Sequence, residues 1–227
     1  MVAGGKRSAK HYTGVMSCAI CQKRRPKRYC PGVRAEICPV CCGTEREVTV
    51  RCPSDCEFLI EARRHERPME IDPEKIPHQD VQLSDEFIES NADLITVLSA
   101  AIVMEADRNR LVDSDAREAL AGLIQTYRTL QNGVIYESIP SNPLAARLYR
   151  ALQEAAAEFL KREKAALGMA KTRDGDVMRA LVFLHIFSLD RNNGRPFGRS
   201  FLDALPRPQL PDDGTRAEDT GSPLILP

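Results

Sequence analysis

The eight cysteines are the residues of this chain best suited to chemistry, because they cluster in one short segment. All of them lie between residues 18 and 56, and the rest of the 227-residue chain has none. The pairs Cys18–Cys21 and Cys38–Cys41 have the Cys-x-x-Cys spacing that presents two sulfur atoms to one metal ion. Eight thiolates fill two tetrahedral sites. We therefore predict two Zn²⁺ ions, bound by Cys18, Cys21, Cys30, Cys38, Cys41, Cys42, Cys52 and Cys56.

The expected cellular location favours thiolates over disulfides. No apolar run follows the first basic residues, so the sequence predicts no secretory signal and a reducing, cytoplasmic environment. An iron–sulfur cluster, disulfides and free redox thiols are the alternatives. Four thiolates leave no open position on zinc, and the chain has no phosphate-binding lysine loop, nucleophile elbow or dinucleotide fingerprint. We therefore expect structural zinc and no enzymatic activity.

Two pairings of the cysteines are open. In the first, Cys38, Cys41, Cys52 and Cys56 form one site, and Cys18, Cys21, Cys30 and Cys42 form the other. It depends on a short strand at residues 48–50 and a helix that starts near Pro53, which together resemble a treble-clef finger. In the second, Cys18 and Cys21 meet Cys38 and Cys41. The local pattern favours the first pairing.

The cysteine segment also resembles a known module. The stretches CAICQKRRPKRYCP and ICPVCCGTEREVTVRCPSDCEFLIEARRHE are similar to the N-terminal cysteine module of a group of functionally uncharacterised bacterial proteins. The resemblance covers about residues 16–67. It implies a zinc-finger-like module followed by a helical domain, and it implies no particular activity.

Charge is distributed unevenly along the chain. Residues 1–67 carry 14 Lys and Arg against 7 Asp and Glu (net +7), whereas residues 68–227 carry 18 against 25 (net −7). The stretch between Cys21 and Cys30 is especially basic, and a tyrosine at its edge could stack on an exposed base. We name as the candidate polyanion-binding residues Lys23, Arg24, Arg25, Lys27, Arg28 and Tyr29. Solvated side chains without a ligand are the simpler interpretation.

These features predict a non-enzymatic zinc-binding protein that contacts RNA or another polyanion through this basic loop. The first alternative is a protein–protein adaptor, in which the zinc module docks an acidic partner or the chain's own acidic half. The second is a thiol-based redox sensor. We expect no membrane partner, because no apolar stretch reaches the length of a membrane span.

Helices must form most of the remainder. We predict a mainly α fold in which a flexible basic tail (1–15) precedes the cysteine module (16–67), a proline-containing linker (68–82), an antiparallel bundle of about four helices (83–205) and a disordered tail (206–227). The helices should start at Ser84, at Asp113 or Ser114, at Asn142-Pro143, and at Thr172 or Asp174. The first should continue to about Asp107, and Val177–Phe187 should be buried on almost every side.

Three further features outside the cysteines could carry function. His65 follows Glu61 by four residues, which predicts a surface pair rather than a metal site. His185 should be a hydrogen-bonded core histidine. The segment Arg191–Arg199 spaces three arginines by four residues and could hold an anion, although a helix stop at Asn193-Gly194 is the favoured interpretation.

Overall fold

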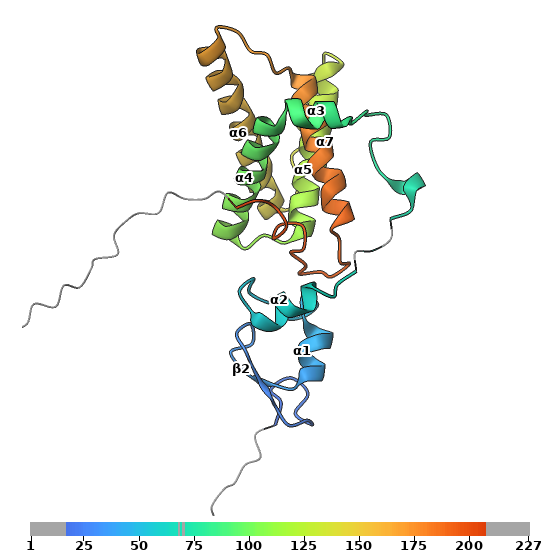
Figure 1. Ribbon diagram of the computed structural model, residues 1–227, viewed down its shortest axis with the longest axis vertical. Coiled ribbons are helices and arrows are strands. Elements are labelled where there is room, and N and C mark those ends of the chain that lie inside the picture. Colours follow the sequence, from blue (N-terminus) through green and yellow to red (C-terminus); the bar gives the residue numbers. More distant parts are fainter. Residues whose placement is uncertain (1–16, 68, 70, 208–227) are drawn as a thin grey trace, which may run out of the picture.

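The computed structural model describes residues 17–67, 69 and 71–207. The predicted tail at 1–15 and most of the predicted tail at 206–227 lie outside the described residues. A small cysteine module lies at one end of a longer helical bundle (Figure 1), so the mainly α fold class is confirmed. Within the described part of the chain, no helix has the length and apolar content needed to cross a membrane.

The module contains two strands and two short helices. Strands β1 (Arg28–Cys30) and β2 (Ala35–Ile37) pair in antiparallel register, with Tyr29 opposite Glu36. Helix α1 (Pro39–Glu45) follows at once, and helix α2 (Glu57–Arg63) comes after an irregular loop. A cysteine turn, a hairpin and a helix start follow one another in the order of a treble-clef finger. The hairpin is β1–β2 and the helix is α1, so these elements lie earlier in the chain than the ones predicted from the sequence.

The predicted strand at residues 48–50 is wrong. The backbone N–H groups of Val48, Thr49 and Val50 all donate to the carbonyl of Glu45, so the chain turns tightly after α1. Glu47 adopts a left-handed backbone conformation with φ of 52°, and its side chain is fully buried. The β-branched pattern did not reveal that a buried carboxylate would determine the path of this loop.

The bundle begins with a short helix that interrupts the predicted first helix. Before it, the chain forms only the short 3-10 helix η1 (Pro73–Lys75) among the described residues after α2. Ser84 accepts a hydrogen bond from the backbone N–H of Phe87 and so caps α3 (Asp85–Ser90). The amide side chain of Asn91 then donates to the carbonyl of Phe87 and ends that helix before α4 (Ala92–Asn109) starts. The prediction of a single helix from Ser84 to about Asp107 was therefore wrong. The helix is interrupted at Asn91, because an asparagine side chain competes with the helical backbone for hydrogen bonds.

Three long helices complete the bundle, close to the predicted boundaries. They are α5 (Asp113–Gln131), α6 (Pro143–Leu167) and α7 (Asp174–Asp190). Asn142 caps α6 as predicted, and it also donates to the carboxylate of Asp115 at 2.7 Å. The α5–α6 connection therefore returns alongside α5, and these two helices start at the same end of the bundle. Helix α4 packs mainly against α6, and α5 packs mainly against α7.

The bundle core is aliphatic, and α7 is its most buried helix, as predicted. Side chains on most faces of α7 are buried in the core. Phe201 and Leu202, in the segment after α7, cover one end of the core. His185 of α7 is also buried and contacts Nε2 of His78 through its Nδ1 at 3.1 Å. The expectation of a hydrogen-bonded core histidine is confirmed. Burial, then the positive charges of His78 and Arg117, lower the pKa of His185 to about 4.

The segment after α7, residues 191–205, joins the bundle to the module. We call it the docking segment. The amide of Asn193 donates to the carboxylate of Glu47 at 3.0 Å, and the backbone N–H of Phe197 donates to the carbonyl of Glu47 at 2.8 Å. Arg63 of α2 contacts Glu47 at 2.8 Å and also forms an ion pair with Asp203. The segment that the sequence singled out therefore binds the module of its own chain.

Candidate metal centre

Four cysteines converge on one point of the module. The sulfur atoms of Cys18, Cys21, Cys38 and Cys41 all lie within 4.8 Å of one another, and those of Cys21 and Cys38 are 4.0 Å apart. A tetrahedral ion with metal–sulfur bonds of about 2.3 Å requires sulfur atoms roughly 3.8 Å apart. The set therefore fits one tetrahedral metal ion. It is the interleaved pairing of the two that the sequence left open, so the favoured pairing was wrong.

Local backbone structure places these four sulfur atoms. Cys18 and Cys21 lie on a tight turn in which the N–H of Gln22 donates to the carbonyl of Cys18 at 2.8 Å. Strand β2 leads directly to Cys38, which is the N-cap of α1, and Pro39 occupies the first helical position. Cys41 then lies in the first turn of the helix, on the same side as its cap.

Backbone N–H groups point at the sulfur atoms. The N–H of Cys38 donates to Sγ of Cys18 at 3.2 Å, and the N–H of Cys41 donates to Sγ of Cys38 at 3.4 Å. Burial alone would raise the pKa of Cys18, but backbone donors from Cys21, Cys38 and Ile20 outweigh it and lower that pKa to about 6. For Cys41, burial and then the neighbouring sulfurs raise the pKa to about 12. Four thiolates this close repel one another, and a bound cation removes that repulsion.

The other four cysteines share a second location. Cys30, Cys42, Cys52 and Cys56 all line one cavity of about 10 Å³, a volume that holds one water-sized sphere, and Cys41 of the first set also reaches its wall. They come from β1, from α1, from the loop before α2 and from the N-cap of α2. Burial raises the pKa of Cys52, and the charges of Cys30 and Cys56 add to this effect, whereas a backbone hydrogen bond with Glu47 opposes it. Among the described residues, this second set does not meet the 4.8 Å separation that the first set does.

Two arginines face the second set. Nη1 of Arg28 lies 3.6 Å from Sγ of Cys42, and Nη2 of Arg46 lies 3.9 Å from the same atom. The guanidinium of Arg28 also stacks on the ring of Phe58 at 4.3 Å. Arg28 is one of the candidate polyanion-binding residues, but its guanidinium group instead contacts Cys42 and Phe58 within the module.

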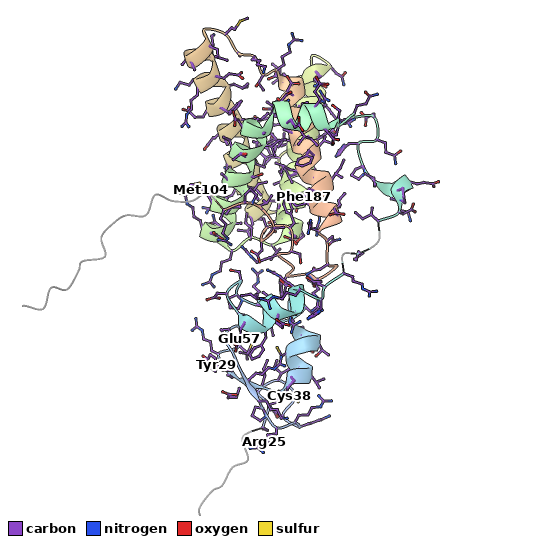
Figure 2. All side chains as sticks on the ribbon, in the orientation of Figure 1. Arg25, Tyr29, Cys38, Glu57, Met104 and Phe187 are labelled. Carbon is purple, nitrogen blue, oxygen red and sulfur yellow. The ribbon has the colours of Figure 1, made fainter. Side chains whose placement is uncertain are left out.

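The remaining candidate polyanion-binding residues divide into two groups. Arg24 is also exposed, but its interaction with the side chain of Cys38, followed by the charges of Cys21 and Cys38, raises its pKa. Lys23, Arg25 and Lys27 are exposed, and Tyr29 is 57% exposed. Figure 2 shows Arg25 at the end of the module farthest from the bundle and Tyr29 nearer to the bundle. The structure therefore keeps three cations and one aromatic ring available to solvent.

The pair of His65 and Glu61 lies on the surface of the module, as predicted. Their side chains are 3.3 Å apart and more than half exposed. The metal set lies elsewhere, and neither side chain belongs to it.

Comparison of the chain with protein-family models, with curated proteins and with solved structures found no match in any of the three. The resemblance of residues 16–67 to a bacterial cysteine module thus has no support beyond the residues that suggested it.

Proposed function

We propose that the module binds two zinc ions as structural elements and that the protein acts by binding a polyanion, RNA foremost, rather than by catalysis. The observation that carries the metal proposal is the convergence of Cys18, Cys21, Cys38 and Cys41, and the remaining four cysteines support it by gathering around one small cavity. One set has sulfur separations that fit a tetrahedral ion, and the other shares a cavity too small for an organic substrate. Zinc suits sites made of four thiolates and, when bound, supplies a fixed tetrahedral crosslink.

Metal analysis tests this proposal directly. Native mass spectrometry with elemental analysis should give two zinc ions per chain. Cys18→Ser should remove one of them, and Cys52→Ser should remove the other, because the two residues belong to different sets. One zinc per chain in the unmodified protein would refute the second site. Iron in place of zinc would overturn the metal assignment.

Polyanion binding is supported by the exposed cations of the basic loop. Within the described part of the chain, no carboxylate lies within 4.0 Å of the charged groups of Lys23, Arg25 or Lys27. Their charges are therefore not neutralised within the molecule. The loop runs from Cys21 of the first set to Cys30 of the second, so bound metal would hold both of its ends. These cations are then clustered at little additional cost in conformational entropy.

The test is a charge reversal that leaves the module intact. The triple variant Lys23→Glu, Arg25→Glu, Lys27→Glu avoids Arg24 and Arg28, which have internal roles. With single-stranded RNA, the slope of log affinity against log salt should decrease in magnitude by about 2, because each phosphate contact contributes about 0.7. The control reverses three exposed cations of the helical part, Arg150, Lys164 and Lys171. Equal losses in both variants, or no RNA binding by the unmodified protein, would contradict the proposal.

An adaptor role is the second candidate, and one observation favours it. The basic module docks on the acidic helical half of its own chain through Arg63 and Asp203. If the protein binds no RNA, capture of an acidic protein partner by the same exposed cations becomes the leading hypothesis.

A further inference from the structure

One cleft between the module and the bundle is lined by more basic than acidic side chains, unlike a neighbouring cleft on the same boundary. It has a volume of about 500 Å³. The turn between β1 and β2 and the loop before α2 form one wall, and the end of α4 with the docking segment forms the other. Side chains of both parts of the molecule therefore face one another across it.

The charged residues that line this cleft are four arginines and one aspartate: Arg34, Arg51, Arg110, Arg199 and Asp107. The charge of Arg199 is balanced within the protein, since its guanidinium lies 3.5 Å from Asp107 and 3.5 Å from Asp203. Arg207 also pairs with Asp107, at 2.8 Å. Among the described residues, no carboxylate lies within 4.0 Å of the guanidinium groups of Arg34, Arg51 or Arg110. The cleft therefore carries excess positive charge.

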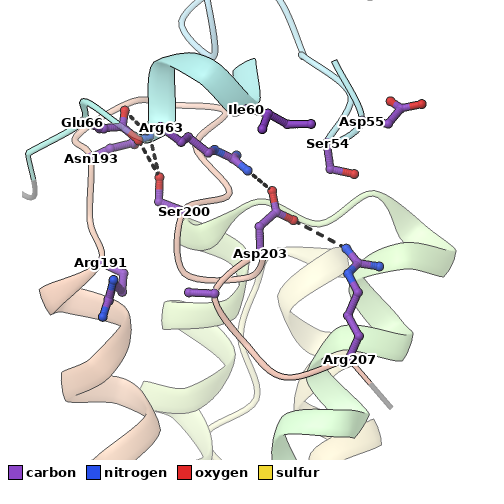
Figure 3. Close-up of a pocket in the computed structure, with 11 residues that line it drawn as sticks. Ser54, Asp55, Ile60, Arg63, Glu66, Arg191, Asn193, Ser200, Asp203 and Arg207 are labelled. Atoms are coloured by element: carbon purple, nitrogen blue, oxygen red, sulfur yellow. Dashed lines mark hydrogen bonds and ion pairs between the residues drawn. The ribbon is translucent and has the colours of Figure 1, made fainter. Parts of the chain in front are cut away.

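A neighbouring cleft on the same boundary shows the contrast. It has a volume of about 580 Å³, and its three arginines are matched by three acidic residues (Figure 3). Arg63 there pairs with Asp203, and Glu66 accepts from Asn193 and Ser200. The basic and acidic residues that line this cleft are equal in number, so it carries no excess charge.

The three unbalanced arginines are exposed to solvent, with ordered backbone at two of them and a stacked guanidinium at the third. Arg34 and Arg110 both adopt left-handed conformations, with φ of 57° and 53°, and the N–H of Arg34 donates to the carbonyl of Cys30 at 2.7 Å. The guanidinium of Arg51 stacks on the ring of Phe197 at 4.5 Å. The left-handed conformation of Arg110 ends α4, because its backbone N–H donates to the carbonyl of Ala106.

We propose that this cleft binds a phosphate-bearing ligand, with Arg34 and Arg51 of the module and Arg110 of the bundle supplying the positive charge. Guanidinium groups donate paired hydrogen bonds to phosphate oxygens, and three of them match a group that carries more than one negative charge. The ligand contacts both parts of the molecule, so its binding stabilises their docked arrangement. This site is separate from the basic loop and does not depend on it.

The test compares tripolyphosphate with a short single-stranded RNA, each titrated calorimetrically at constant ionic strength. Arg34→Asn and Arg110→Asn remove one cation each, and asparagine tolerates the left-handed backbone at both positions. Each variant should lose roughly tenfold to a hundredfold in affinity, the range expected for hydrogen bonds to a charged group. Arg191→Asn, in the balanced cleft, is the matched control and should change affinity less than twofold.

The two ligands identify the source of the phosphate. Binding of tripolyphosphate that depends on Arg34 and Arg110 supports a small phosphorylated ligand, and dependence seen with RNA alone supports a nucleic-acid backbone. Affinities for both ligands that stay within twofold in Arg34→Asn and Arg110→Asn would overturn the proposal, as would an equal loss in Arg191→Asn. If tripolyphosphate does not bind and RNA affinity falls only in the loop variant described above, the cleft is refuted and the loop remains a site.

Discussion

Replacing Arg63 by methionine should destabilise the protein strongly, because Arg63 neutralises a buried carboxylate. The side chain of Glu47 is 1% exposed and that of Arg63 is 18% exposed, and they lie 2.8 Å apart. Burial alone would lower the pKa of Arg63, but the charges of Asp203 and Glu47 outweigh it and raise that pKa. Removing one partner of a buried ion pair costs about 3–5 kcal/mol. That is a large part of the roughly 5–15 kcal/mol by which a typical protein is stable.

Arg64 provides the matched control for this prediction. It is the next residue in the chain and pairs with Glu61 at 2.9 Å, but its side chain is 69% exposed. An exposed pair contributes about 0–1 kcal/mol, so Arg64→Met should have little effect. The double variant Arg63→Met, Glu47→Gln removes the unpaired charge and should recover part of the loss.

Urea denaturation measures these differences, with circular dichroism reporting the helices and a coloured zinc chelator reporting the module. The reasoning is refuted if Arg63→Met costs no more than Arg64→Met. It also fails if the double variant is less stable than Arg63→Met alone, because the buried charge of Glu47 would then not be the source of the loss.

Two further predictions concern pH and backbone packing. The low pKa of His185, about 4, keeps it neutral in the folded state, so it contributes stability above about pH 6.5 that is lost as the pH falls towards 4. The loss in the free energy of unfolding is about 3 kcal/mol. Urea denaturation across this pH range should show a weaker pH dependence of stability for His185→Gln than for the unmodified protein. An unchanged pH dependence would contradict the role given to His185. Gly32→Ala should lower the free energy of unfolding by about 1–3 kcal/mol, because its Cβ would lie 2.7 Å from Cγ1 of Val50 and 2.8 Å from the carbonyl oxygen of Arg51. Gly43→Ala, inside α1 with nothing within 4 Å of the added Cβ, should raise it by about 0.5–1 kcal/mol, and thermal unfolding of the two variants should therefore shift in opposite directions.

Local signals in the sequence predicted the helices well. Ser84 and Asn142 cap their helices through hydrogen bonds that involve only neighbouring residues, and Gly133 follows the end of α5 with φ of 76°. The break at Asn91 was missed because an asparagine within an apolar periodic pattern does not show by itself that its amide will bond the preceding turn. The clearest predictions were thus those whose causes lie within four residues.

The cysteine pairing could not be predicted in this way, because it depends on contacts between distant segments. Cys18 and Cys38 are joined by a hydrogen bond across 20 residues. The hairpin of β1 and β2 brings them together, and its strands are only three residues long. A strand that short leaves little alternation to detect. The β-branched run at residues 48–50 gave a stronger but misleading pattern.

The role of Glu47 was also out of reach. Nothing in its local sequence distinguishes it from the other acidic residues of the module, and its partners Arg63 and Asn193 lie 16 and 146 residues away. The three arginines at residues 191–199 were visible as a pattern, but the sequence offered a helix stop or an anion site as explanations. A contact surface for the module of the same chain requires knowledge of the assembled fold.

The long sequence separation of the docking contacts affects how a newly made chain folds. Arg63 and Asp203 are 140 residues apart. At synthesis rates of about 5–20 residues per second, the cysteine module leaves the ribosome roughly 7–28 s before the docking segment exists. The metal ions proposed above have that interval in which to bind before the docking segment is available. The boundary between the two parts closes only after residues 191–205 have been made, because Arg63 of the module pairs with Asp203 of that segment.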